Sequence, residues 1–597
     1  MKAATKKAAT KKASKKRTPE TSERELELCS AEDHAFRSES LLEAQEYADA
    51  AQEAERALDC LPLMARAALT RGRALLHPAL SKMVEEGEVP SMELLDQAHR
   101  AFRLAATLDP EDKDTKEEIK SLQGLLAELP TPAPPASVAI VKPTAAEFDV
   151  IIVGAGAAGV GTALMLTKTF GLDASRVLLI ERGEAVGETF RRWPAEMRFI
   201  SPSFNQQGWT SSFDLNSVAH GTSPAYSLHA EHPSGSEYAG YLKQLASAAA
   251  LNVRTQTEVT SVKAVGAKGG SPLFHVEVCS SKRSSSSGGG EPASRKQARS
   301  GERLAARYVV WAAGEFQYPR ESTGDVAGAD LCVHNSRVRS WAKLPGDDRV
   351  VIGGYESGVD AAVNLAKAGK QVTVLASTST WNVQTPDPST ELAPYTAARL
   401  REVCAAGFAP RPKLLAPLRV LRVERAAAGG FNVTAAWKAD EAPLPTGPLR
   451  TPLGVAAGTD LGGAARAEGS ELVIHTTQPP VLCTGFEGSV ASAANHLFSF
   501  AGPSDEAKGC LAGAPLLTAS DESTKVPGVF LVGPTVRHGE HSFCFVYKFR
   551  QRFGIVAHAI CRGLGRRDAD MAAEVARKMN MYLDDFSCCK AACGETC

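Results

Sequence analysis

The residues with the clearest chemical use are three glycines, Gly154, Gly156 and Gly159, which follow an apolar run at the spacing GxGxxG. At this spacing the first glycine permits a tight turn, the second lets the backbone approach a pyrophosphate, and the third lets a helix pack close to a strand. Glu181 stands 22 residues after Gly159, where a carboxylate accepts hydrogen bonds from a ribose diol. Together these residues predict a dinucleotide site.

Two strands and a helix must position these residues. Residues 150–153 and 177–180 are apolar runs of strand length, and residues 160–166 continue with helical character. The amides of Ala157 and Ala158 at the helix start complete the predicted phosphate site, because unsatisfied amides there carry partial positive charge. The stretch is too short and too rich in glycine for a membrane span.

A second strand–glycine–helix unit begins at residue 349, with strands predicted at 350–352 and 372–375. Tyr355 takes the place of the middle glycine. Residues 377–379 are Ser-Thr-Ser, so no acid follows the second strand, which leaves room for a 2′-phosphate and favours NADP over NAD. No arginine stands nearby in the sequence to bind that phosphate. The residues assigned to this second site are Gly353, Gly354, Tyr355, Glu356, Ser357 and Gly358.

Two such units on one chain resemble the two-dinucleotide-binding-domain flavoproteins, in which FAD takes hydride from a nicotinamide. VVWAAGEFQYPR (309–320), VLCTGF (481–486) and VPGVFLVGP (526–534) look like three further glycine segments of that fold. The acid usual after the last segment is Pro534 here. The resemblance runs from residue 148 and implies FAD at the first site and NAD(P)H at the second. It adds these residues to the FAD site: Arg182, Gly187, Thr189, Gly314, Gly485, Gly533 and Pro534.

Two segments of the chain resemble two different branches of that superfamily. Residues 187–203 and 232–246 resemble segments of flavin-containing monooxygenases and of bacillithiol-disulfide-reductase-like proteins. The monooxygenase fingerprint FxGxxxHxxx(Y/F/W) is not cleanly present, and the CxxxxC and CxxC dithiols of related reductases are absent from their usual places. Oxygenation of a small substrate at a soft N or S atom needs no protein dithiol and is the first hypothesis. The alternatives are a disulfide, thiol or metalloid reductase, and a non-catalytic flavin-binding redox sensor.

The cysteine-rich end of the chain offers candidate catalytic groups for the reductase alternative. Cys588 and Cys589 are vicinal, and four cysteines lie within the last ten residues. This tail is similar to that of mercuric reductases, and thiolates suit soft ions and disulfide exchange. The alternative is an exposed tail without function. No structural metal site is predicted.

Two histidines after the late glycine segment are further candidates. The resemblance places this segment beside the flavin, so that His538 and His541, with Glu540 and Cys544, are candidates for protonating flavin or substrate. The alternative interpretation is structural: both histidines cap the following helix, and Lys548, Arg550 and Arg552 form its solvated face.

Composition and charge indicate a globular protein of several domains. The chain has 597 residues, of which 44 % are hydrophobic and 23 % charged. The first 17 residues carry a charge of +8, so the rest carries −9 and no nucleic-acid role is expected. Neither a secretory signal nor a membrane anchor is expected, and 13 scattered cysteines suit a reducing compartment. We expect a cytoplasmic protein; the basic tail is also compatible with a nuclear address.

The predicted fold class is α/β, with two Rossmann-like domains after an all-α region. Residues 22–128 have apolar residues at helical spacing and resemble tetratricopeptide (TPR) repeats, although a generic helical bundle fits as well. A protein partner for this region is a hypothesis. The predicted segments are a disordered basic tail (1–21), the helical region (22–128), a Pro-rich linker (129–147), the first part of the FAD domain (148–345), the NAD(P)H domain (346–480), the last part of the FAD domain (481–580) and a Cys-rich tail (581–597).

Overall fold

A computed structural model divides the chain into two compact units, residues 1–141 and 142–597. The structure describes residues 34–60, 65–85, 112–128 and single positions between 95 and 109 in the first unit, and residues 146–203, 213–265, 272–281, 301–321, 326–382, 391–405, 407–438, 468–502, 513–539 and 541–585 in the second. Among these residues no helix combines the length and the apolarity that a membrane crossing requires.

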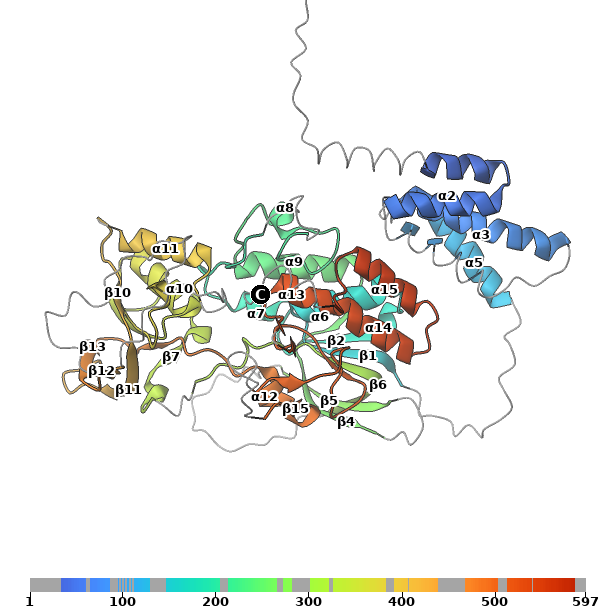
Figure 1. Ribbon diagram of the computed structural model, residues 1–597. Coiled ribbons are helices and arrows are strands. Elements are labelled where there is room, and N and C mark those ends of the chain that lie inside the picture. The colour runs from blue at the N-terminus through green and yellow to red at the C-terminus, as the bar shows by residue number, and fades with distance from the viewer. Residues whose placement is uncertain are drawn as a thin grey trace, which may run out of the picture. The chain divides into compact units, whose positions relative to one another are not determined.

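The first unit is helical, as the spacing of its apolar residues predicts (Figure 1). Its helices include α2 (Tyr47–Cys60), α3 (Ala65–Glu85) and α5 (Lys113–Glu128). The close approach of Phe102 to α3 requires a glycine, because a Cβ at Gly72 would lie 2.4 Å from the ring. Arg73 donates to Glu118 at 2.7 Å and so joins α3 to α5. The TPR assignment stays a prediction.

The first sheet of the second unit has seven strands in the order β3-β2-β1-β6-β5-β4, and β17 pairs with β6. β3, β2, β1, β6 and β17 run parallel, whereas β4 and β5 add an antiparallel extension. Val153 lies opposite Ile180 and Trp311, so the carboxyl ends of β1, β2 and β6 form one edge. The strands are β1 (Phe148–Val153), β2 (Val177–Ile180), β3 (Asn252–Arg254), β4 (Thr257–Ala264), β5 (Phe274–Ser280), β6 (Glu302–Trp311) and β17 (Val529–Leu531).

Helices pack against this sheet and enclose its apolar core. The core joins β1, β2 and β6 to α6, α9, α14 and α15, and α14 contacts both α6 and α15. The helices are α6 (Ala157–Leu164), α7 (Glu188–Arg191), α8 (Pro224–Leu228), α9 (Gly235–Ala248), α12 (Ser489–Ala493), α13 (Val546–Phe549), α14 (Phe553–Gly563) and α15 (Ala569–Lys578). Two short strand pairs, β15 (Ser499–Phe500) with β16 (Pro515–Leu516) and β18 (Arg537–His538) with β19 (His541–Ser542), lie in the connections.

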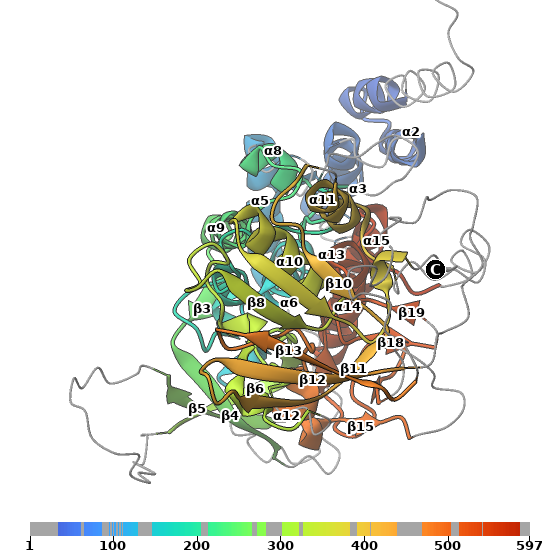
Figure 2. The ribbon, with the colours of Figure 1, turned by 90° about the vertical axis from the view of Figure 1, so that its left-hand side faces the viewer.

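The second sheet is parallel, in the order β10-β9-β8-β14-β7. One apolar cluster joins it to α10 and α11, and another joins it to the antiparallel strands β11, β12 and β13, so the sheet is covered on both sides (Figure 2). β7 belongs to this sheet, although the sequence places its residues in the first domain. The elements are β7 (Val333–His334), β8 (Asp348–Ile352), α10 (Glu356–Lys367), β9 (Gln371–Leu375), α11 (Pro394–Cys404), β10 (Lys413–Leu415), β11 (Leu418–Arg425), β12 (Phe431–Trp437), β13 (Glu471–Thr476) and β14 (Val481–Leu482).

The two sheets confirm the predicted class: α/β, with two Rossmann-like units after a helical region. Each unit contains a strand, a glycine turn and a helix, followed by a parallel neighbouring strand. The turns therefore lie at the carboxyl edges of the sheets, where ligands bind in folds of this kind.

Candidate functional site

The first glycine turn has the geometry that a bound pyrophosphate needs. Gly154 has a φ of +106°, and a Cβ at Gly159 would lie only 1.9 Å from the Gly154 carbonyl oxygen. At Gly156 an added Cβ would meet no atom within 4 Å, so the backbone there faces open space. α6 begins directly after Gly156 without a side-chain cap, which leaves its first amides to bind phosphate.

Glu181 lies at the end of β2, beside this turn. Its carboxylate accepts hydrogen bonds from the Ala155 amide at 3.0 Å and the Gly183 amide at 2.7 Å. Burial raises the pKa of the Glu181 carboxyl, and the two amide hydrogen bonds act in the opposite direction. The position suits the predicted ribose contact.

A cavity of about 420 Å³ runs along this edge of the first sheet. It is also lined by the start of α10 in the second domain, so it lies where two nucleotides on the two turns approach each other. The predicted site residues that line it are Gly154, Gly156, Ala157, Ala158, Glu181, Arg182, Thr189, Gly314, Glu356, Ser357 and Pro534.

The other predicted glycines shape the backbone around the cavity rather than line it. Gly187 has a φ of +74°, and its amide donates to the Ala155 carbonyl at 2.9 Å. A Cβ at Gly533 would lie 3.2 Å from Ala158, which shows how closely the end of β17 approaches α6. The Gly485 carbonyl accepts from the Arg320 amide at 3.1 Å, where the two connections between the domains run together.

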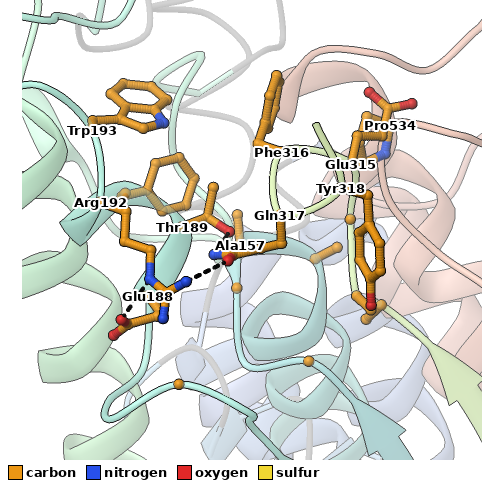
Figure 3. Close-up of a pocket in the computed structure, with 18 of the residues that line it drawn as sticks. Ala157, Glu188, Thr189, Arg192, Trp193, Glu315, Phe316, Gln317, Tyr318 and Pro534 are labelled. Atoms are coloured by element: carbon orange, nitrogen blue, oxygen red, sulfur yellow. Dashed lines mark hydrogen bonds and ion pairs between the residues drawn. The ribbon is translucent and has the colours of Figure 1, made fainter. Parts of the chain in front are cut away.

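A polar cluster, of which the sequence singled out only Thr189, holds one wall of the cavity (Figure 3). The Glu188 carboxylate accepts from Arg192 at 2.9 Å, and Arg192 also donates to Gln317 at 3.1 Å. Gln317 in turn donates to the Thr189 hydroxyl at 2.9 Å. The cluster joins α7 to the loop after β6, about 125 residues further along the chain, so its only signal in the sequence is that both ends lie in segments of the family resemblance.

The part of the cavity farther from Glu181 is called the β6 end. It is lined by Gly314, Glu315, Phe316, Pro534 and Cys544. It follows β6 and β17, on the far side of β1 from Glu181. A dinucleotide with its ribose at Glu181 and its pyrophosphate at Gly156 therefore extends toward this end. Figure 3 shows Glu315 beside Pro534 here.

Aromatic side chains form another wall of the cavity. Phe190, Trp193 and Phe199 line it and contact one another: the ring centroids of Phe190 and Trp193 are 5.2 Å apart, and those of Phe190 and Phe199 are 5.5 Å apart. Phe316 lines the cavity as well and remains about half exposed. These apolar side chains exclude water from one side of the site.

The second glycine turn repeats the backbone of the first. Gly353 has a φ of +110°, and a Cβ at Gly358 would lie 1.9 Å from the Gly353 carbonyl oxygen. Gly354 has a packing role, because a Cβ there would lie 2.4 Å from the Ala376 Cβ. Tyr355, at the position of the middle glycine, is partly exposed before the start of α10.

Glu356 and Ser357 reach the cavity from the N-terminus of α10. The Glu356 carboxylate accepts hydrogen bonds from the Ala393 amide at 2.5 Å and the Thr396 hydroxyl at 2.6 Å. The side chain therefore joins α10 to the start of α11. The geometry gives Glu356 a structural contact in addition to its predicted cofactor contact.

Lys438 is a cation at the end of β9 that the linear sequence did not reveal. Its side-chain nitrogen donates to the Ser377 carbonyl at 3.3 Å. The Lys438 amide donates to the Pro417 carbonyl. Leu418, which follows Pro417, donates its amide to the Ala376 carbonyl at 2.7 Å. These two backbone hydrogen bonds fix Lys438 beside the end of β9. Lys438 lies 61 residues from Ser377 in sequence, and only the pairing of β11 and β12 brings them together.

The two predicted catalytic histidines do not line the cavity. His538 forms a short hydrogen bond with the Asp521 carboxylate, which also accepts two hydrogen bonds from Arg552, at 2.8 and 2.9 Å. His541 lies opposite His538 in the β18–β19 pair. The geometry does not support a direct role for His538 in protonating a substrate; it favours a role in positioning this hairpin.

The alternative interpretation of the same segment is also corrected. Arg550 and Arg552 were expected on a solvated helix face, but they are 0 % and 1 % exposed. Arg550 donates to the carbonyls of Phe213 and Ser217, at 3.0 and 2.8 Å, and Arg552 pairs with Asp521. Helix spacing alone did not reveal this, because the partners lie up to 337 residues away.

The cysteines divide into those that the structure describes and those that it does not. Cys588 and Cys589 lie outside the described residues, so their predicted role stays a prediction. Among the described cysteines, only Cys544 lines the cavity, and it is exposed.

Residues 151–278 and 297–424 match the family model of the pyridine nucleotide-disulphide oxidoreductases. These two stretches contain both glycine turns. With the fold, this match defines the second unit as a two-dinucleotide-binding-domain flavoprotein. It is an FAD- and NAD(P)H-dependent oxidoreductase. The first turn fits FAD, because Gly156 leaves open space before uncapped amides and Glu181 lies where a ribose binds.

The chain is also similar to several solved structures. Bacillithiol disulfide reductase from Staphylococcus aureus is 17 % identical, with a TM-score of 0.47, and the match covers 70 % of this chain and 99 % of that protein. Ornithine N-hydroxylase from Kutzneria sp. 744 is 16 % identical over the same shares, also with a TM-score of 0.47. A flavin-containing monooxygenase from Stenotrophomonas maltophilia is 16 % identical, with a TM-score of 0.39, over 72 % of this chain and 100 % of that protein. None of these scores reaches 0.5, so the class rests on the family match and on the geometry.

Proposed function

We propose that the protein oxygenates a small substrate at a nitrogen or sulfur atom, using FAD, O₂ and NADPH. FAD supplies the redox chemistry when bound, and the chain supplies position and environment. The stretch from Gly154 to Glu181 holds the ADP half of FAD, and the β6 end receives its flavin half. The start of α10 brings the nicotinamide to the same cavity.

The observation that carries this proposal is the character of the cavity wall. Phe190, Trp193, Phe199 and Phe316 make much of it apolar and aromatic. A site that excludes water protects reactive species from side reactions, which oxygen activation requires. Cys544 is the one thiol that lines the cavity among the described residues, and oxygenation needs no thiol.

The preference for NADPH is supported by Lys438. Its ammonium group lies at the end of β9, where dinucleotide-binding folds bind the 2′ substituent of the adenosine ribose. No acid is present between residues 376 and 382 to accept a hydrogen bond from a 2′-hydroxyl. A lysine here attracts a phosphate as a point charge.

A thiol or disulfide reductase is the second candidate, and Cys544 favours it. This exposed thiol lines the β6 end. The Leu583 amide donates to the Gln551 carbonyl at 2.9 Å, so the segment that leads to Cys588 and Cys589 begins beside the residues that follow α13. In this mechanism a protein disulfide formed by these cysteines would accept the two electrons that NADPH supplies, would become a thiol pair, and would pass the electrons on to the substrate disulfide.

One set of assays separates the two candidates. Full-length protein with bound FAD is mixed with NADPH in air, and hydrogen peroxide, oxygenated amine or sulfide products and reduction of small disulfides are each followed. The same assays are run on a Cys588→Ser/Cys589→Ser double variant and on Cys544→Ser. Unchanged activity of both variants refutes the reductase candidate, whereas loss of all NADPH oxidation in either refutes the oxygenase proposal. A protein that binds no FAD refutes both.

A further inference from the structure

Glu315 differs from the other carboxylates that line the cavity. Glu181 accepts two amide hydrogen bonds, Glu188 pairs with Arg191 and Arg192, and Glu356 is held by the start of α11. Asp360 pairs with Arg399 at 2.8 Å, and Glu258 lies 3.6 Å from Arg182. Among the described residues none donates a hydrogen bond to the Glu315 carboxylate.

The position of Glu315 is fixed by its neighbours. It follows Gly314 directly at the carboxyl end of β6, and its side chain lies beside Pro534 (Figure 3). A Cβ at Gly488 would lie 3.6 Å from the Glu315 Cγ, so the loop after β14 packs against the stem of the side chain. The carboxyl group is thereby held at the β6 end, where the flavin half of FAD is expected.

The surroundings of Glu315 favour its protonated form. Burial raises the pKa of the Glu315 carboxyl above its usual range, and Arg537, on β18, acts in the opposite direction. Arg537 is the one charged group that acts on this carboxyl among the described residues. The Arg537 guanidinium donates to the carbonyls of Pro534 and Val536.

Both candidate reactions consume one proton for each nicotinamide that is oxidised. Oxygenation converts NADPH, H⁺, O₂ and substrate into NADP⁺, water and oxygenated substrate. Disulfide reduction converts NADPH, H⁺ and a disulfide into NADP⁺ and two thiols. A proton donor at the reacting end of the cavity therefore serves either reaction.

We propose that Glu315 is the general acid of this site. Its carboxyl O–H bond breaks, and the proton forms a new O–H bond on the oxygen atom that leaves as water. If the reductase candidate holds, the new bond is an S–H bond on the leaving sulfur. The resulting carboxylate takes a proton back from water before the next turnover. The proposal rests on the oxidoreductase function and holds for either candidate reaction.

The test compares Glu315→Gln, which keeps the shape but carries no proton, with Glu315→Asp, which keeps an acid. The matched control is Glu487→Gln, an exposed carboxylate on the neighbouring connection that lies outside the cavity lining. We expect Glu315→Gln to lower turnover roughly 100- to 10,000-fold at neutral pH, the usual contribution of a general acid. The wild type should lose rate as the pH rises through the pKa of Glu315. Glu315→Asp should retain this decline and Glu315→Gln should lack it.

Two further measurements need no turnover. Infrared difference spectra of the protein with FAD alone should show a protonated carboxyl band that disappears as the pH rises and is absent from Glu315→Gln. Anaerobic reduction of bound FAD by NADPH should stay within about twofold of wild type in all variants, because hydride transfer needs no proton from this acid. If wild type turns over and Glu315→Gln matches Glu487→Gln in rate and pH profile, the Glu315 proposal is wrong. If wild type itself does not oxidise NADPH, the proposed function fails instead.

Discussion

The role given to Lys438 leads to a quantitative prediction about cofactor choice. Lys438→Gln removes the positive charge beside Ser377 while keeping a side chain of similar length. The side chain is only partly buried, so the dielectric constant near it approaches that of water. For an ammonium and a phosphate near −2 that are about 5 Å apart, Coulomb's law gives roughly 1.7 kcal/mol in water, and salt at physiological strength reduces this to about 1 kcal/mol. We therefore expect about a fivefold loss of affinity for the 2′-phosphate.

The assay is equilibrium binding of 2′,5′-ADP and of 5′-AMP to the full-length protein with FAD, measured by calorimetry. Lys438→Gln should lower the affinity for 2′,5′-ADP about fivefold and change the affinity for 5′-AMP less than twofold. The difference between the two ligands should shrink at high salt. Lys438→Glu should roughly double the free-energy loss. Lys367→Gln, at the far end of α10 where the lysine pairs with Glu402, is the matched control. If Lys438→Gln lowers the affinity for both ligands equally, or for neither, the assignment of Lys438 to the 2′-phosphate is wrong.

Two other predictions concern the scaffold of the site. Gly159→Ala should abolish FAD binding, because the new Cβ would lie 1.9 Å from the Gly154 carbonyl oxygen; the absorbance of bound flavin in the purified variant checks this, and normal FAD content would contradict it. Asp521→Asn should lower the free energy of unfolding by about 3–5 kcal/mol, since it leaves Arg552 buried without its countercharge. Asp568→Asn breaks the more exposed ion pair with Arg566 and should lower the free energy of unfolding by at most about 1 kcal/mol. Denaturant titrations followed by flavin release measure both losses, and equal losses would show that burial of the Asp521 pair does not matter.

The local parts of the site were predictable because they depend on short-range geometry. Gly154 and Gly353 have φ values of +106° and +110°, which favour glycine, and a Cβ at Gly159 would lie 1.9 Å from the Gly154 carbonyl oxygen. The strands beside each turn are apolar because both faces of a parallel sheet are covered. The sequence therefore predicts two nucleotide turns, their order along the chain and the acid at the end of β2.

Other parts depend on contacts between residues far apart in the chain, and the sequence did not specify them. It left His538 as a candidate acid and Arg552 on a solvated face, whereas both join Asp521 in a buried cluster. Whether a charged residue is buried depends on which distant partner the fold brings to it, because an unpaired buried charge costs several kcal/mol. Helix periodicity carries no information about such a partner.

By itself the sequence predicted two dinucleotide sites and where the backbone turns at them, because those properties are set by residue types within about 30 positions of each other. Only the tertiary structure decided which side chains face the space between the two cofactors. Glu315 is one residue after a predicted glycine, yet the sequence did not reveal that the loop after β14 packs against its side chain or that no described residue donates a hydrogen bond to it. Lys438 likewise reaches β9 only through strand pairing. The chemistry of the cavity is therefore set by packing between distant segments.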